Sequence, residues 1–225
     1  MTGTLVNLAT VLAGSTAGLL LGRRLPERVA TACMQAVGAV TLAVGIKMVL
    51  GASTPITTVL ISLCLGAVLG ELADIEGRLE RLGRRLEAVF GQGRRGNFTQ
   101  GFMTASLLYC VGPMTVLGCL QDGLRGDPSI LITKATMDGI SSVALAAALG
   151  FGVLCSAATI LAYQGSLTLL ASQLGGLLTD PVVEGLTATG GLLIVCLAFN
   201  IWGMARLRVT NMLPALVVVT LILSL

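Results

Sequence analysis

Two short segments of this chain place polar side chains inside apolar sequence, where they could do chemistry. The first reads YCVGPMTVLGCLQDGL. Pro113 lacks an N–H, so the carbonyl of Tyr109 loses its helical partner, and Gly112 beside it offers little resistance to bending. The freed carbonyl and the Thr115 hydroxyl could coordinate a small cation or bind a solute; a kink that only shapes the bundle is the alternative. The polar candidates here are Tyr109, Thr115, Gln121 and Asp122.

The second polar segment, KATMDGISS, opens another apolar stretch. Lys134 and Asp138 stand four residues apart, so they share one helix face and lie close enough to pair. Ser142 continues that face, and Ser141 lies beside it. If Asp138 lies inside the hydrocarbon core, it is the best candidate for a proton or cation carrier. If it lies at the interface, it is a cap and one half of an ion pair.

Other polar side chains are scattered over the apolar stretches. Gln164 and Asn200 are of a type that more often joins helices than binds solutes. Asn211 precedes Pro214, which removes the helical partner of the Thr210 carbonyl. Because polar groups in hydrocarbon are costly unless they are paired or face water, these amides are also candidate binding residues.

The composition excludes a water-soluble domain. Of 225 residues, 55% are hydrophobic and 11% are charged, against about 25% charged residues in soluble domains. The chain has no histidine, and its six cysteines lie singly in apolar runs. We therefore expect no metal site, no disulfide framework and no cofactor. The net charge of +3 does not indicate a nucleic-acid partner.

Stretches of about 20 apolar residues are long enough to cross a bilayer as helices. We predict an all-α membrane protein in which residues 1–225 form one integral membrane domain of seven or eight spans, the fourth and eighth broken. The short stretch 165–178 either spans or enters the membrane only partway. The candidate spans are 3–22, 29–50, 54–73, 99–120, 138–162, 165–178, 182–204 and 209–225.

The polar stretch 74–97 has apolar residues at helical spacing and arginines on its other faces. It is predicted to be an amphipathic helix on the membrane surface. Arginines also collect at 23–28 and 206–208, and Lys and Arg mark the cytoplasmic side. Eight crossings would place all three groups on that side and the N-terminus outside.

Two sequence patterns concern helix packing. Residues 36–52 can be laid over 189–205 without gaps, with Gly38 opposite Gly191. Under eight crossings the two segments would be inverted, as in many secondary transporters; chance similarity of apolar helices is the alternative. A G-x-x-x-G stripe near the start promotes close packing, within the chain or across a dimer. Its members are Gly14, Gly18 and Gly22.

Several segments resemble the motifs of a family of multi-pass bacterial inner-membrane proteins, the YdfK/YqgA type, or domain of unknown function 554. They are GPMTVLGCLQDGL, MDGISSVALA, YQGSLTLLA, RVTNMLPAL and the initial NLATVLAGSTAGLLLG. The resemblance covers essentially the whole chain. It implies the bacterial inner (plasma) membrane and an association with transport, without a substrate. The GAM at the family's kink is here Gly112-Pro113-Met114, so a site there could differ in shape.

We expect a small secondary transporter or channel-like permease for a small solute or ion in the lipid bilayer. Its site would be lined by Tyr109, Gly112, Pro113, Thr115 and Asn200. Asp138, with Gln121 and Asp122, would couple transport to protons or cations. The alternative is a non-transporting membrane subunit or regulator that acts through the 74–97 helix.

Enzymatic activity is not expected, because no nucleophile motif accompanies Ser141, Lys134 or Asp138. One bundle of 225 residues leaves limited room for an aqueous path. A homo-oligomer is therefore expected, with a dimer favoured.

Overall fold

The computed structural model describes residues 1–22, 27–78, 81, 98–110, 113–174 and 179–224. Within these residues, five helices are long and apolar enough to cross a membrane, and a pair bent by 59° makes a sixth candidate. The five are α1 (Thr2–Gly22), α3 (Ile56–Ala73), α7 (Ser129–Leu149), α8 (Gly152–Leu169) and α10 (Asp180–Ile201). The bent pair is α5 (Phe98–Cys110) and α6 (Pro113–Arg125). The remaining elements are α2 (Glu27–Leu50), α9 (Ala171–Leu174), η1 (Val209–Met212) and α11 (Pro214–Ser224).

Helix α3 buries mostly small and polar side chains and exposes large apolar ones. Its buried residues are Val59, Ser62, Gly66 and Gly70. Its exposed residues include Leu60, Ile61, Leu65, Val68, Leu69 and Leu72. Lipid tails are as apolar as leucine, so membrane helices place small residues where they contact one another and leave leucines facing the lipid. The prediction of a helical membrane bundle is confirmed.

The glycine stripe of α1 packs within the chain, against α7. A Cβ atom at any of its three glycines would overlap a backbone carbonyl oxygen of α7. These carbonyls belong to Gly139, Val143 and Ala147. The two backbones are therefore in direct contact, as the G-x-x-x-G pattern permits. The dimer remains a prediction, and it would have to form through other faces.

Contacts along neighbouring helices give their relative directions. Helix α1 runs parallel to α7, because Gly3 lies beside Leu131 and Gly22 lies beside Ala147. It runs antiparallel to α8, and α8 runs parallel to α5. These directions agree with a chain that crosses a membrane eight times, with α5 and α6 forming one broken crossing.

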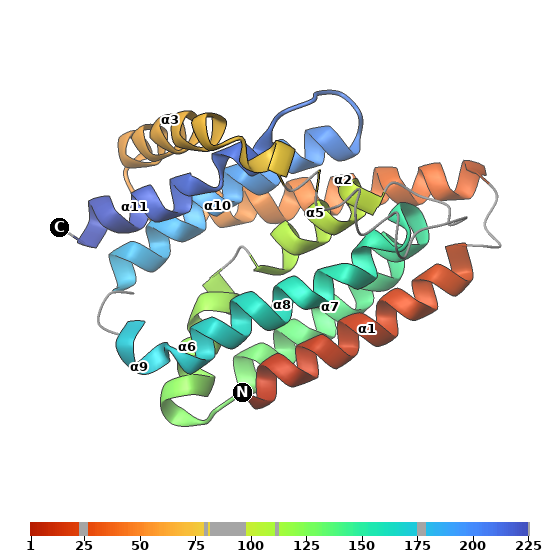
Figure 1. The fold of residues 1–225 in the computed structure, drawn as a ribbon, viewed down its shortest axis with the longest axis horizontal. Helices are drawn as coiled ribbons and strands as arrows, with labels where there is room; N and C mark the ends of the chain where they lie inside the picture. Colours follow the sequence, from red (N-terminus) through yellow and green to blue (C-terminus); the bar gives the residue numbers. More distant parts are fainter. Residues whose placement is uncertain (23–26, 79–80, 82–97, 111–112, 175–178, 225) are drawn as a thin grey trace.

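The two segments that align in the sequence pack against each other, in α2 and α10. Gly38 lies against the indole of Trp202 and Gly45 against the carbonyl of Gly191, so the two helices run antiparallel. Helices α3 and α11 pack in the same antiparallel way. In Figure 1 these four helices lie together, with α1, α6, α7 and α8 in the other part of the molecule. The arrangement agrees with an inverted repeat.

The predicted boundaries of two spans are wrong. Instead of one helix over 138–162, α7 ends at Leu149 and α8 begins at Gly152. Gly150 makes the turn with a φ of 83°, a backbone conformation that favours glycine. In the described part of the stretch 165–178, the first residues belong to α8, which ends at Leu169, and α9 follows over Ala171–Leu174. Hydropathy does not reveal the turn at Gly150, because apolar residues continue on both sides of it.

Helix α7 also begins before the predicted span, at Ser129 rather than at residue 138. The backbone N–H of Ser129 donates to the Asp127 carboxylate at 3.0 Å, which satisfies an amide in the first turn. This hydrogen bond holds the pKa of Asp127 below its usual range. Of the predicted surface helix 74–97, residues 75–78 are helical, and residues 79–80 and 82–97 lie outside the described residues, as do Arg23, Arg24 and Gly112.

Close packing of α1 on α7 predicts that Gly18→Ala destabilises the protein. The added methyl group would overlap the carbonyl oxygen of Val143, and such overpacking costs about 1–3 kcal/mol. Thermal unfolding in detergent would show a lower midpoint. Gly165→Ala is the matched control, because its Cβ would meet only the Met1 side chain, at 3.9 Å. Equal midpoints for the two variants would contradict the close contact.

Candidate functional site

An ion pair lies at the middle of α7. Asp138 is the tenth of the 21 residues of this helix, about 14 Å from its start at 1.5 Å per residue. The ammonium of Lys134, one turn earlier, pairs with the Asp138 carboxylate, and each residue is only 7% exposed. Because α7 begins before the predicted span, Asp138 lies inside the bundle rather than at a helix start.

Two amides from other helices join this ion pair. Nδ2 of Asn7 in α1 donates to Asp138 Oδ2 at 3.0 Å and to Oε1 of Gln164 in α8 at 3.2 Å. We call Asn7, Lys134, Asp138 and Gln164 the buried polar cluster. It links α1, α7 and α8. Asn7 is missing from the sequence-based candidates, although an amide inside the first apolar run is a signal that could have found it.

The buried polar cluster has unused hydrogen-bonding capacity. Oδ1 of Asn7 and Nε2 of Gln164 are buried and have no hydrogen-bond partner in the part of the chain that the structure describes. Each unsatisfied polar group in hydrocarbon costs several kcal/mol. One acceptor and one donor are therefore available beside the ion pair for water, an ion or a polar solute.

The break between α5 and α6 borders this cluster. Tyr109, the last residue but one of α5, is fully buried, and Lys134 Nζ lies 6.0 Å from the centre of its ring. A cation at this distance from an aromatic face is attracted by it. The Thr115 hydroxyl donates to the carbonyl of Tyr109 at 3.1 Å. The carbonyl freed by Pro113 is thus occupied by a side chain of α6 rather than open to a ligand.

Asp122 and Gln121 lie apart from the ion pair. The buried carboxylate of Asp122 accepts the backbone N–H of Gly3 at 3.0 Å and pairs with the N-terminal ammonium, also at 3.0 Å. It therefore satisfies the first turn of α1. Gln121 donates to Asp127 in the exposed loop before α7. Asp122 thus stabilises the start of α1, and Gln121 stabilises the loop before α7.

Some predicted groups are satisfied locally. The Ser142 hydroxyl donates to the carbonyl of Gly139 at 2.8 Å, and Ser141 is half-buried beside it. The Thr210 carbonyl, expected to be free because of Pro214, accepts the N–H of Leu213 at 3.2 Å. The eighth predicted span is broken there as expected, into η1 and α11.

The two predicted asparagines brace the polar end of α3 and α10. Nδ2 of Asn200 donates to the carbonyl of Leu207 at 2.7 Å, and the Leu207 N–H donates to Asn200 Oδ1 at 2.8 Å. Asn211 donates to Glu71 and accepts the backbone N–H of Glu76 at 2.7 Å. Asn200 thus holds the loop after α10, and Asn211 links η1 to the end of α3 and to Glu76.

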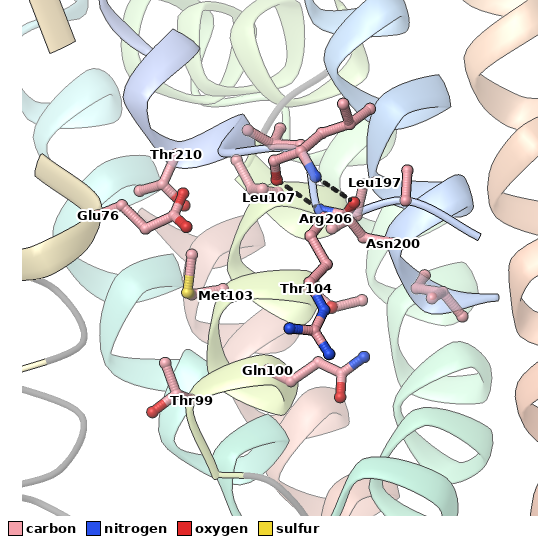
Figure 2. A pocket seen from close by; sticks show the side chains of 14 residues that line it. Glu76, Thr99, Gln100, Met103, Thr104, Leu107, Leu197, Asn200, Arg206 and Thr210 are labelled. Atoms are coloured by element: carbon pink, nitrogen blue, oxygen red, sulfur yellow. Dashed lines mark hydrogen bonds between the residues drawn. The ribbon is translucent and has the colours of Figure 1, made fainter. Parts of the chain in front are cut away.

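A pocket of about 670 Å³ lies next to Asn200 (Figure 2). It is formed by α5, the end of α10, the loop that follows it and η1, with Glu76 on one side. Pro214 is not among the residues that line it. Leu107 of α5 faces this pocket, whereas Ala105 and Tyr109 pack with Leu145 of α7. Helix α5 therefore stands between the pocket and the buried polar cluster.

Bundle and cluster together define a polytopic helical membrane protein with an ion pair in its interior. Within the described residues, no group of three or more His, Cys, Asp or Glu side chains could hold a metal ion. What the cluster offers chemically is a carboxylate that can gain or lose a proton, a tethered ammonium and two amides.

The chain belongs to the family described as protein of unknown function (DUF554), which it matches over residues 2–224. It is 30% identical over 222 residues to the uncharacterized membrane protein YdfK of Bacillus subtilis, covering 97% of this chain and 93% of that protein. It is 31% identical over 218 residues to the uncharacterized protein YqgA of Escherichia coli, covering 95% and 92%. The expected family is confirmed. No solved structure matches the chain.

Burial of the ion pair predicts a specific pattern of stability. Lys134→Met or Asp138→Leu alone leaves one buried charge without its partner, and such a loss costs about 3–5 kcal/mol. The double variant Lys134→Met/Asp138→Leu removes both charges and should recover most of that loss. Thermal unfolding of the four proteins in detergent forms a double-mutant cycle. Additive losses in the double variant would argue against a paired, buried site.

Proposed function

We propose that this protein is a small secondary transporter or channel-like permease of the bacterial inner membrane, with Asp138 as its coupling group. The Lys134–Asp138 pair at the middle of α7 carries the proposal. Buried ion pairs contribute little net stability compared with well-packed apolar residues. Ionisable residues inside membrane helices instead mark ion pathways and proton relays.

A change of charge at Asp138 would act on three helices at once. While the carboxylate is ionised, Lys134 neutralises it and Asn7 donates to it. Protonation would remove the attraction to Lys134 and weaken the link from α1 to α7. The Lys134 ammonium occupies the position beside the Asp138 carboxylate that a bound cation would take. Binding of a proton or a cation at Asp138 would therefore alter the helix packing beside the α5–α6 break.

The position of the pocket supports an opening toward one side of the membrane. With eight crossings, residues 74–97 and the loop with Arg206 and Arg208 lie on the cytoplasmic side, with the N-terminus outside. Arg206 and Glu76 of these segments line the pocket, so under this topology it would open to the cytoplasm. In this proposal the chain has no enzymatic activity and functions as a homo-oligomer, most simply a dimer.

Proton-coupled transport predicts solute-dependent proton flux that needs Asp138. The purified protein is reconstituted in liposomes that enclose a pH-sensitive dye, and amino acids, organic acids and monovalent cations are added outside in turn. We expect at least one addition to change the internal pH with the native chain and not with Asp138→Asn. Asp127→Asn, in the exposed loop before α7, is the matched control and should retain the flux.

Equal flux in the native and Asp138→Asn proteins would rule out Asp138 as the coupling group. Absence of any flux, together with a second protein that co-purifies in stoichiometric amount, would argue for the subunit or regulator role instead.

A further inference from the structure

The pocket beside Asn200 presents opposite charges on a partly apolar surface. Arg206 and Glu76 both line it, together with Thr99 and Thr104. Apolar walls come from α5 and α10. Its volume of about 670 Å³ lies within the usual range of small-molecule sites, roughly 300–1,000 Å³. Figure 2 shows the Arg206 side chain extending toward Thr104 and Gln100 of α5, with Glu76 on another side of the pocket.

Arg206 differs from Arg208, two residues later, in having no partner among the residues that the structure describes. The guanidinium of Arg208 pairs with Glu71 and Asp74 and takes no part in lining the pocket. In the described part of the chain, Arg206 forms no ion pair or hydrogen bond. A guanidinium presents a planar fork of donors that matches a carboxylate. This difference between two arginines of one loop indicates that Arg206 serves the pocket.

Both charged groups are attached to braced backbone. The two hydrogen bonds between Asn200 and Leu207 hold the residue next to Arg206. Oδ1 of Asn211 accepts the backbone N–H of Glu76 at 2.7 Å and fixes the position of that residue. Pre-organised groups bind more tightly because less freedom is lost on binding. Asn200 and Asn211 are therefore positioning residues for this pocket.

We propose that the pocket binds a small zwitterion of the amino acid class. Arg206 takes the carboxylate, Glu76 accepts the ammonium, and the apolar walls contact the side chain. A carboxylate accepts several hydrogen bonds at once, so Glu76 can receive an ammonium in addition to other contacts. One cation and one anion match a zwitterion better than a simple anion, which the Glu76 carboxylate would repel. The inference rests on the proposed function only in identifying this ligand as the transported solute.

Binding can be measured on the whole protein in detergent, without a gradient. Isothermal titration with glycine, L-alanine, L-serine and L-leucine tests the class. Titration with 4-methylpentanoate and 3-methylbutylamine tests each charge alone. We expect at least one of the four amino acids to bind, and neither single-charge probe to bind within tenfold of L-leucine's affinity. Arg206→Gln and Glu76→Gln should each weaken amino acid binding by tenfold or more, while Arg206→Lys retains part of it.

Arg208→Gln is the matched control, since it removes the same charge outside the pocket, and it should bind like the native chain. Equal melting midpoints without ligand show which variants remain folded. If no amino acid binds, or if Arg206→Gln binds unchanged, the inference is wrong. If 4-methylpentanoate binds as tightly as L-leucine, the site is an anion site and the zwitterion is excluded.

The two proposals fail separately. Amino acid binding that needs Arg206 and Glu76, without flux in liposomes, would support the pocket and overturn transport. Flux of another solute that needs Asp138, with no amino acid binding, would contradict the proposed ligand of the pocket and support the proposed transport.

Discussion

The direct contact between the backbones of α1 and α7 is the constraint on which the interior depends. Only glycines on α1 let the two helices approach until carbonyl oxygens of α7 touch the α1 backbone. At this separation the short side chain of Asn7 reaches Asp138 and also Gln164 of α8. A larger residue in the stripe would move α1 outward, and the amide would lose both partners. The hydrogen bonds of the buried polar cluster therefore depend on the close packing of α1 against α7.

The two broken spans show how a proline can be accommodated without leaving an open site. In each break, a carbonyl that loses its helical partner is satisfied from nearby: by the Thr115 hydroxyl after α5, and by the Leu213 N–H before α11. A helix break in an apolar bundle is thus weak evidence for a binding site by itself. Among the described residues, buried polar atoms without a hydrogen-bond partner occur on Asn7 and Gln164, and also on the hydroxyls of Tyr109 and Thr210 beside the breaks.

The sequence predicts the class of fold well, because apolar length and the scarcity of charge are set by the bilayer. It misplaces the turn at Gly150, where apolar residues continue on both sides and hydropathy does not change. Within the site, the spacing of Lys134 and Asp138 correctly indicates a pair. The same reasoning cannot separate Gln164, which joins that pair through Asn7, from Asn200, which holds a loop. Both are amides near apolar helices, and only distances in space distinguish them.

The placement of both charges on one helix affects how membrane voltage could act. Lys134 and Asp138 lie one turn apart on α7, so the pair carries no net charge while both are ionised. A displacement of α7 would then move no charge through the electric field. Once the carboxylate is protonated, the lone ammonium makes the same displacement electrogenic, at about 2.3 kcal/mol per 100 mV for a full crossing. Protonation of Asp138 would thus determine whether the membrane potential acts on a displacement of α7.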